Sequence, residues 1–522
     1  MTVETFFANF GHLAGAPNGV QKLRELILQL AAQGKLVSQA KNDEPASVLL
    51  ERIDAQRKLL LKEGKVRKPK QYESVEEKEQ FCLVPENWCW ARMGELILDI
   101  TGGGTPSKNN PSYWGGDIPW ASVKDVGKSK YLDSTIDSIT PKGLQCSSSN
   151  LIPKGRVIIC TRMGLGKISI NRIDVAINQD LKALWLPECL EMDYFYNFFL
   201  TQDVKGTGMT VAGIRQDALL NMPVPLPPLE EQKRIVAKVD QLMALCDELE
   251  ARQQKQQQGR VRLNNSALDA LLTAREPDDF AVHWQRISTN FDLLYDHPET
   301  IAKLRAAILQ LAVQGKLLGG QSKSIRSGTK VKDFVSLQNG YAFKSSWFSN
   351  EGVRLVRNKN ISHGHLDWTE SAMLSVKQAG EYERFNLSEG DIVLSLDRPI
   401  ITTGLKVARI SEDDLPSLLL QRVGRFQFKN NELLPDYLYV WLKSPCFIET
   451  IDPGRSNGVP HISSKEVENI PFEVFSIEEQ KRIVAKVQQL MALCDELEAS
   501  LNQAQQHSKK LMEATVRQLL VA

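Results

Sequence analysis

Residues 230–251, EEQKRIVAKVDQLMALCDELEA, return almost unchanged as residues 478–499, EEQKRIVAKVQQLMALCDELEA. Asp240 against Gln488 is the one difference between the two copies. Such similarity inside one chain is typical of a repeated architecture. The chain is therefore expected to contain two copies of one structural unit.

Each copy has the apolar spacing of a coiled-coil helix. The apolar positions advance by four, three, four and three residues, and they are Ile235, Val239, Leu242, Cys246 and Leu249, then Ile483, Val487, Leu490, Cys494 and Leu497. This spacing places them on one seam that needs a partner helix. Ser476 and Glu479 have the spacing of a capping box at the second start, and Pro227 and Pro228 suit the first turn of the first copy.

A shorter block is also repeated upstream of each long helix. LRELILQLAAQGKLV, from Leu23, returns as LRAAILQLAVQGKLL, from Leu304, and both have helical apolar spacing. Gly34 and Gly315 stand where a left-handed residue ends a helix. The two copies of the short block start 281 residues apart, and the two copies of the long block start 248 residues apart. The segment between the short block and the long block is therefore 33 residues shorter in the second half (281 − 248).

The segments between the repeated blocks diverge in sequence. Both have short β-branched runs bounded by Gly and Pro, which predicts strands of a mixed α/β domain. The shared order of motifs predicts one fold with two different surfaces. The expected boundaries are an N-terminal helical region and charged extension at 1–80, a first variable domain at 81–228, a central spacer helix at 229–275, a linker with the repeated short helix at 276–324, a second variable domain at 325–475, and a C-terminal spacer helix at 476–522.

Residues outside the apolar seam are as well preserved between the two copies as the residues on the seam. A solvent-exposed face would be free to change after duplication, so two explanations remain: a recent duplication, or two equivalent surfaces that dock two copies of one partner. The divergence of the middle segments favours the second explanation. The predicted docking residues are Glu230, Glu231, Gln232, Lys233, Arg234, Glu478, Glu479, Gln480, Lys481 and Arg482.

Composition and motifs argue against several functions. The 64 Lys and Arg nearly balance the 63 Asp and Glu, and the eight Cys form no C-x-x-C pair. Gly102–Gly104 is not followed by the spacing of a phosphate loop, and Asn110–Tyr113 lacks the second proline of a methyltransferase N-P-P-Y motif. No apolar run approaches the roughly 20 residues of a membrane span, and no signal peptide is evident. We expect a cytoplasmic protein with no catalytic residue, no metal site and no membrane partner.

These motifs together resemble the specificity (S) subunits of type I restriction-modification enzymes. The resemblance is carried by LRxxILQLAxQGKL, by GGGTPSKNNPSYWGGDIPW (Gly102 to Trp120), and by P-L-x-E-Q-K-R-I-V running into a long helix, which recurs before the second long helix with Ser476 and Ile477 in place of the P-L pair. It covers nearly the whole chain. It implies an α+β fold with two mixed α/β target recognition domains, separated by two long antiparallel coiled-coil helices and related by an internal pseudo-twofold repeat.

The resemblance also implies the partners. Each recognition domain is expected to read one half of a split site in double-stranded DNA, and the two halves should differ because the domains differ. Two methyltransferase (M) subunits would dock on the repeated regions, and two motor and nuclease (R) subunits would join them. S-adenosylmethionine, ATP and Mg²⁺ are expected in those partners, with no cofactor in this chain.

The candidate DNA contacts are polar and basic residues in loops of the variable domains. Arg, Lys and Asn make hydrogen bonds to base edges or neutralise phosphates. The candidates are Thr105, Ser107, Lys108, Lys124, Arg162, Lys167 and Arg215 in the first domain, and Arg357, Lys359, Asn360, Arg398, Lys406, Arg455 and Asn457 in the second. Two alternative functions remain, a coiled-coil interaction scaffold and a single-chain restriction-modification enzyme.

Overall fold

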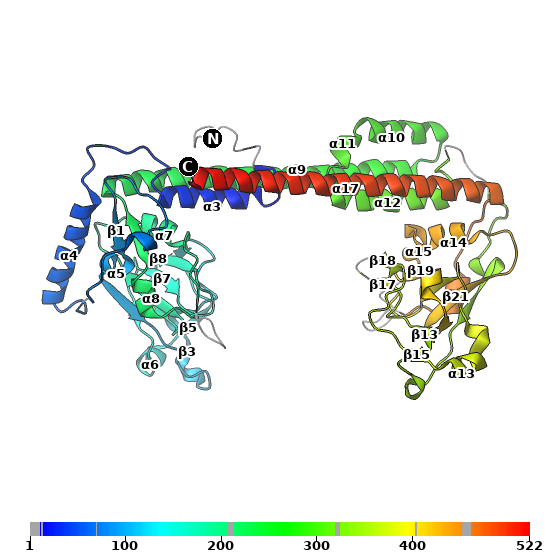
Figure 1. Cartoon of the computed structure of the whole chain (residues 1–522), viewed down its shortest axis with the longest axis horizontal. Helices are drawn as coiled ribbons and strands as arrows, with labels where there is room; N and C mark the ends of the chain where they lie inside the picture. Colours follow the sequence, from blue (N-terminus) through cyan, green and yellow to red (C-terminus); the bar gives the residue numbers. More distant parts are fainter. Residues whose placement is uncertain are drawn as a thin grey trace. The chain divides into compact units, whose positions relative to one another are not determined.

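The computed structural model describes residues 11, 14–68, 70–206, 213–318, 324–401, 404–451 and 461–521. The chain divides into two compact units (Figure 1). Unit 1 comprises Met1–Gln254 and Gln505–Ala522, and unit 2 comprises Lys255–Ala504. Each unit therefore contains one α/β domain, one repeated short helix and a part of both long helices.

The long helices are α9 (Leu229–Thr273) and α17 (Ile477–Val521), with 45 residues each. In unit 1, seam residues Ile235 and Val239 from the start of α9 share a buried core with Leu519 from the end of α17. In unit 2, Ile483 from the start of α17 shares a core with Leu271 from the end of α9. The two helices therefore run antiparallel within each unit, as predicted.

The short repeated helices pack onto these cores. They are α3 (Gly19–Ala32) in unit 1 and α12 (Pro298–Val313) in unit 2. Beyond each helix end, Gly34 and Gly315 have φ values of +70° and +69°. The next residue bonds back to the helix, from Lys35 N to Leu30 O at 2.9 Å and from Lys316 N to Leu311 O at 3.0 Å. This is the Schellman type of helix end, so the predicted glycine terminators are confirmed.

The second long helix begins as its sequence predicts. Ser476 N donates to the Glu479 carboxylate at 3.2 Å, and Glu479 N donates to Ser476 Oγ at 3.3 Å. These reciprocal bonds make the capping box, which satisfies two backbone N–H groups that a helix start leaves without partners. Both copies have the same first backbone bond, from Gln232 N to Pro228 O and from Gln480 N to Ser476 O, each at 2.9 Å. The first copy differs in having Pro228 where the second has the capping serine. The prediction that Pro227 and Pro228 form the first helical turn is wrong, because α9 begins at Leu229.

The α/β domain of unit 1 contains two main sheets. One sheet has the strand order β2-β10-β7-β8-β4 and the other the order β5-β3-β9-β6, while β1 pairs with β11. The strands are β1 (Cys89–Arg92), β2 (Asp99–Gly102), β3 (Trp114–Ala121), β4 (Tyr131–Leu132), β5 (Asp137–Ile139), β6 (Leu151–Ile152), β7 (Val157–Cys160), β8 (Ile168–Asn171), β9 (Val175–Ile177), β10 (Leu181–Trp185) and β11 (Pro223–Leu226). The further helices of unit 1 are α4 (Ala46–Lys62), α5 (Met93–Leu96), α6 (Pro141–Gln145), α7 (Met192–Phe199) and α8 (Gln216–Leu220).

The α/β domain of unit 2 repeats this arrangement. Its larger sheet has the order β12-β21-β16-β19-β14, the second has the order β15-β13-β20, and β17 pairs with β18. The strands are β12 (Val335–Asn339), β13 (Val353–Val356), β14 (His363–Gly364), β15 (Met373–Leu374), β16 (Ile392–Ser395), β17 (Ile400–Ile401), β18 (Gly404–Leu405), β19 (Val407–Arg409), β20 (Ser417–Leu419) and β21 (Val423–Phe428). The further helices are α10 (Pro277–Thr289), α11 (Phe291–Leu294), α13 (Val376–Ala379), α14 (Pro435–Leu442), α15 (Pro445–Ile448) and α16 (Ser464–Glu468).

The larger sheets of the two domains agree strand by strand. In the larger sheets the last pair, β8 with β4 and β19 with β14, is parallel, and every other pair is antiparallel. In the smaller sheets β3 pairs with β9, and β13 with β20, in parallel. The prediction that the divergent middles share one mixed α/β fold is confirmed.

Each α/β domain shares its core with the helices that carry it. Phe195 and Phe198 of α7 are 1% exposed and lie in one core with Leu23 and Ile235. Burying one large apolar side chain contributes about 1.5–3 kcal/mol. In unit 2, Tyr437 and other residues of α14 occupy the same position, and α12 lies between α14 and the long helices (Figure 1). The domains are thus continuous with the helices through apolar packing.

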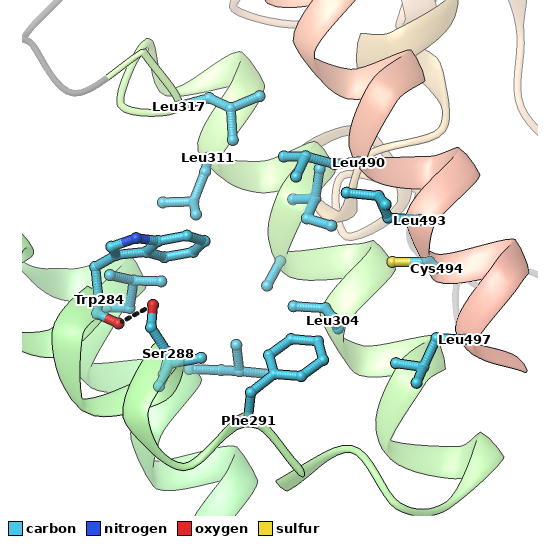
Figure 2. Close-up of a pocket in the computed structure, with 15 residues that line it drawn as sticks. Trp284, Ser288, Phe291, Leu304, Leu311, Leu317, Leu490, Leu493, Cys494 and Leu497 are labelled. Atoms are coloured by element: carbon cyan, nitrogen blue, oxygen red, sulfur yellow. Dashed lines mark hydrogen bonds between the residues drawn. The ribbon is translucent and has the colours of Figure 1, made fainter. Parts of the chain in front are cut away.

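Unit 2 also contains an apolar cavity of about 470 Å³ (Figure 2). Trp284, Phe291 and Leu304 face it from α10, α11 and α12, and Leu490 and Leu497 face it from α17. The hydrogen bond drawn there, from Ser288 Oγ to Trp284 O at 2.9 Å, lies within α10. Along the described residues, no helix is both long and apolar enough to cross a membrane.

Candidate nucleic-acid interface

The loop after β7 is the point where most candidate residues of the first domain meet. Thr161 begins this loop, and its N–H donates to Asp180 O at 2.8 Å while its carbonyl accepts from Ile214 N at 2.9 Å. Arg162 then forms a β-bridge with Gly213. The loop is therefore held between the turn before β10 and the segment that leads into α8.

The remaining candidates of the first domain surround this loop. The Lys167 ammonium lies 3.5 Å from Val123 O, which places it beside Lys124. Arg215 follows the bridged segment, and Thr105 Oγ1 donates to Gln179, the neighbour of Asp180. The structure thus gathers Thr105, Lys124, Arg162, Lys167 and Arg215, whose positions lie up to 110 residues apart in the sequence (215 − 105). Ser107 and Lys108 are exposed in the connection between β2 and β3.

Two tryptophans of β3 stabilise that connection. Trp114 and Trp120 meet edge to face with ring centroids 5.0 Å apart. Trp120 is 5% exposed and its indole N–H donates to Gly104 O at 3.2 Å, while that of Trp114 donates to Ser107 O at 3.2 Å. Gly104 has no space for a side chain, since a Cβ there would lie 2.6 Å from the backbone of Ser148. The two indole rings therefore fix the backbone of the connection through these hydrogen bonds.

The second domain has the same loop after β16. Leu396 N donates to Arg422 O at 2.8 Å, and Leu396 O accepts from Ile462 N at 3.0 Å. Asp397 then forms a β-bridge with His461. Because these bonds match those of Thr161, Leu396 corresponds to Thr161, Asp397 to Arg162, and Arg422 to Asp180.

The candidates on this second loop have different surroundings. Arg398 is exposed and has a φ of +47°, and Met163, its counterpart, has a φ of +50°. Lys406 is 9% exposed, and burial lowers the pKa of its ammonium group. Asn358 Nδ2 donates to Asp397 at 2.9 Å, which brings the loop after β13 against this one. Arg455 and Asn457 lie outside the residues that the structure describes.

The polar side chains of the loop after β13 make hydrogen bonds and an ion pair within the loop itself. Asn360 is 1% exposed and donates to Asp367 O and Glu370 O at 2.9 and 2.8 Å. Arg357 Nε donates to Asn360 Oδ1 at 3.1 Å, and burial lowers the pKa of its guanidinium. Lys359 forms an ion pair with Glu370. These contacts give all three residues a role in holding the loop.

Arg422 is the residue that sequence reasoning missed. It lies in the turn before β21, with its side chain 63% exposed and its guanidinium 3.1 Å from Asp397. Only a weak signal is present in the sequence, because Gln179 before Asp180 matches Gln421 before Arg422 while the paired residues themselves differ. One identical residue in otherwise divergent segments does not align them, so the backbone bonds were needed to establish the correspondence.

A repeated glutamine joins each α/β domain to its long helix. Gln232 Oε1 accepts from Glu191 N at 2.9 Å, and its Nε2 donates to Pro227 O at 2.8 Å. Gln480 does the same with Leu434 N and Phe475 O, both at 2.8 Å. Both side chains are 0% exposed. The recurrence of this glutamine is therefore explained by structure inside the chain, because each side chain accepts a hydrogen bond from the backbone N–H group at the start of α7 or α14.

Glu231 also has an internal role. It is 0% exposed and accepts from Trp88 Nε1 at 3.0 Å and from Gln39 Nε2 at 2.6 Å. Burial raises the pKa of its carboxyl group. Three of the ten predicted docking residues, Glu231, Gln232 and Gln480, thus lie inside the chain. The prediction of a docking surface is therefore kept only for the predicted residues that have exposed surface, which are Glu230, Lys233, Arg234, Glu478, Glu479, Lys481 and Arg482.

Two copies of one α/β domain, each joined by a buried glutamine to an antiparallel helix pair, define a class of internally duplicated proteins whose two domains have different surfaces. The family model "Type I restriction modification DNA specificity domain" matches residues 85–257 and 328–505, together more than half of the chain. The chain belongs to this family of type I specificity subunits.

Individual relatives agree with this assignment. The Type I restriction enzyme EcoAI specificity subunit of Escherichia coli is 34% identical over 551 aligned residues, which cover 95% of this chain and 93% of that protein. The Type I restriction enzyme EcoEI specificity subunit, also of Escherichia coli, is 25% identical over 95% of this chain and 93% of its own length. A solved structure described as "complex assembly and conformational transition of the type I R-M system" has the same fold, with a TM-score of 0.50 and 18% identity over 84% of this chain and 98% of its own.

Proposed function

We propose that this specificity subunit binds double-stranded DNA at an asymmetric two-part site. The observation that carries the proposal is that equivalent loops of two identically folded domains present different residues. Arg162 and Met163 of the first domain correspond to Asp397 and Arg398 of the second. Because base recognition depends on the side chains that reach base edges, the two domains would read unlike half-sites.

The long helices would set the unread gap between the half-sites. A helix of 45 residues is about 68 Å long at 1.5 Å per residue, and DNA advances about 3.4 Å per base pair. If each domain is attached rigidly to its helices, the helix length would fix the number of unread base pairs between the half-sites. The shared apolar cores and the buried Gln232 and Gln480 support this attachment.

We also propose that the repeated helical faces dock two methyltransferase subunits, through which two motor and nuclease subunits join. Both copies of the long block expose the same apolar residue, since Leu245 is 40% exposed and Leu493 is 53% exposed. Leu493 also borders the apolar cavity of unit 2 (Figure 2). A single exposed leucine is common on any protein surface, so the support for a docking surface is that the same exposed leucine recurs in both copies of the block.

The chemistry of the complex would lie in the partners. Among the described residues, no group of three or more His, Cys, Asp or Glu could hold a metal ion. On the basis of the family assignment, we propose that S-adenosylmethionine, ATP and Mg²⁺ are bound by the partner subunits and that this chain contributes recognition without catalysis. A methylation assay of the chain without added subunits tests this assignment, because activity there would favour a single-chain enzyme.

The decisive experiment is a genome-wide long-read methylation map of cells that carry the chain and its methyltransferase subunit, compared with cells that lack the chain. We expect one new motif with two unlike short halves and a fixed gap. The absence of a new motif would favour an interaction scaffold.

Docking has its own test. Leu245→Asp or Leu493→Asp should weaken co-purification of the methyltransferase subunit, because a charge replaces an apolar contact. Leu263→Asp is the matched control, since Leu263 is 48% exposed on α9 outside the repeated block. Equal loss with all three variants would contradict a docking surface on the repeated block.

A further inference from the structure

An arginine–aspartate pair occupies the same place in both α/β domains with its charges exchanged. In the first domain, Arg162 lies on the loop after β7 and Asp180 in the turn before β10, with Nη1 and Oδ1 3.8 Å apart. In the second domain the aspartate, Asp397, lies on the loop after β16, and Arg422 lies in the turn before β21 at 3.1 Å. The backbone bonds that equate these positions do not depend on the side chains.

The two pairs share one pattern of burial. The aspartates are 11% and 10% exposed at the side chain, while the arginines are 51% and 63% exposed. Each aspartate is also oriented by an asparagine, because Asn178 Nδ2 donates to Asp180 at 3.3 Å and Asn358 Nδ2 donates to Asp397 at 2.9 Å. A buried, oriented carboxylate therefore lies beside an exposed guanidinium in each domain, within hydrogen-bond distance in the second domain and in ion-pair contact in the first.

This geometry suits contact with a polyanion. A guanidinium has five N–H donors in a rigid fork. Arg422 donates one hydrogen bond to Asp397 at 3.1 Å, and Arg162 is in ion-pair contact with Asp180 at 3.8 Å, so each guanidinium keeps donors directed elsewhere. An ordinary exposed ion pair gains little from its Coulomb energy, because solvent screens it and two long side chains lose freedom. A short aspartate held below the surface loses little freedom and fixes the arginine where it emerges.

Further basic groups lie around both pairs. Lys167 follows Arg162 on the same loop, and Arg398 and His461 lie beside Asp397, with His461 Nδ1 2.9 Å from its carboxylate. Each loop has its αL residue, Met163 or Arg398, directly after the paired position. Non-glycine residues in this backbone conformation cluster at ligand-binding sites.

We infer that Arg162 and Arg422 are equivalent DNA-contacting residues of the two domains, held in position by Asp180 and Asp397. Arg422 is thereby a DNA contact that lies on the β-turn before β21, whereas its counterpart lies on the loop after β7. The arginine and the aspartate have exchanged positions between the two domains, so the guanidinium comes from the loop in the first domain and from the turn in the second, at the same place in the fold. This inference rests on the proposed DNA-binding function and names residues that carry it.

The test uses the complex of the full chain with its methyltransferase subunits and a duplex that carries the two-part motif. Arg422→Ala and Arg162→Ala should each raise Kd about 10-fold or more. Arg422→Gln, which keeps a donor toward Asp397 without the charge, should have the same effect and guards against a folding defect. Asp397→Asn keeps the arginine but weakens its position, and it should give a smaller rise in Kd.

Matched controls are available in both units. Arg172 pairs with Asp133 at the same 3.8 Å, but both side chains are more than half exposed, and Arg326 is 56% exposed beside Glu432. Arg172→Ala and Arg326→Ala should change Kd less than twofold. The thermal midpoint of every variant shows whether it is folded.

The outcomes also distinguish what the guanidinium contacts. A phosphate contact lowers affinity equally for cognate and unrelated DNA and reduces the salt slope by about 1, whereas a base contact weakens cognate DNA alone and relaxes one position of one half-site. Either result supports the inference. Folded Arg422 variants that bind like Arg326→Ala overturn it, while a wild-type complex that binds no split site overturns the proposed function itself.

Discussion

Replacement of Gln480 by alanine tests how the second recognition domain is held on its helix. Gln480 Oε1 accepts from Leu434 N at 2.8 Å, and Nε2 donates to Glu432 O at 2.7 Å and to Phe475 O at 2.8 Å. The side chain is 0% exposed, so water cannot replace these bonds without a rearrangement. The Gln480→Ala variant would leave one N–H and two carbonyl groups without this partner.

The expected loss follows from those three bonds. A typical intramolecular hydrogen bond contributes about 0.5–1.5 kcal/mol, and an unsatisfied buried group costs about 1–3 kcal/mol. We expect Gln480→Ala to lower the free energy of unfolding of unit 2 by about 2–4 kcal/mol. For a unit of this size, that corresponds to a fall in Tm of about 4–16 °C.

Gln489→Ala is the matched control, because Gln489 is an exposed glutamine of the same helix that accepts from Lys486 Nζ at 3.0 Å. Urea unfolding followed by tryptophan fluorescence measures both variants. The methylation map adds a functional readout, in which Gln480→Ala should weaken recognition of one half-site before the other. If Gln480→Ala is no more destabilising than Gln489→Ala, the glutamine does not join the domain to its helix.

Three further predictions concern local structure and charge. Gly34→Ala should destabilise unit 1 more than Gly64→Ala, because both glycines have a φ of +70° but a Cβ at Gly34 would lie 2.7 Å from Pro85 Cγ, whereas Gly64 has open space; the backbone conformation alone costs about 1–2 kcal/mol, and equal melting temperatures would refute the steric argument. Burial raises the pKa of Glu231 above its usual 4.5, so the folded state holds this proton more tightly than the unfolded state, and the associated stability is present at low pH and lost as pH rises through the raised value. The free-energy difference between wild type and Glu231→Gln, measured by urea unfolding at pH 4.5 and pH 7.5, should therefore shift against wild type at the higher pH; a constant difference would contradict the raised pKa. Phe198→Ala, at a position 1% exposed between the α/β domain and the helices, should cost about 3–5 kcal/mol, whereas Phe81→Ala, at a position 50% exposed, should cost far less in the same unfolding assay.

Much of the architecture followed from local sequence signals. The four-three spacing of apolar residues predicted both long helices, and Gly34, Gly315 and Ser476 marked helix ends, because seam periodicity and end chemistry act over a few neighbouring residues. The near-identity of residues 230–251 and 478–499 showed that the unit is doubled. The shared fold of the two middles followed from their common order of motifs, even where the side chains differ.

The candidate interface depended on tertiary structure. The candidate residues Thr105, Lys124, Arg162, Lys167 and Arg215 are far apart in the sequence. Strand pairing between β7, β8 and β10, the bridge from Arg162 to Gly213, and the contacts of Lys167 with Val123 and of Thr105 with Gln179 bring them together. Off-seam recurrence alone could not separate a buried glutamine from an exposed lysine, because both are polar and both are repeated. The packing of the α/β domains placed Gln232 and Gln480 inside the chain.

The sequence by itself determined the repeat, the helices and the family, since these depend on periodicity and on motifs contiguous in the chain. Tertiary structure alone decided that Arg162 corresponds to Asp397 and Asp180 to Arg422. That correspondence is set by backbone hydrogen bonds between segments about 20 to 70 residues apart, and the side chains at those positions carry opposite charges in the two domains. No comparison of residue types would have aligned them, because the fold preserves the place of the ion pair and not the identity of its members.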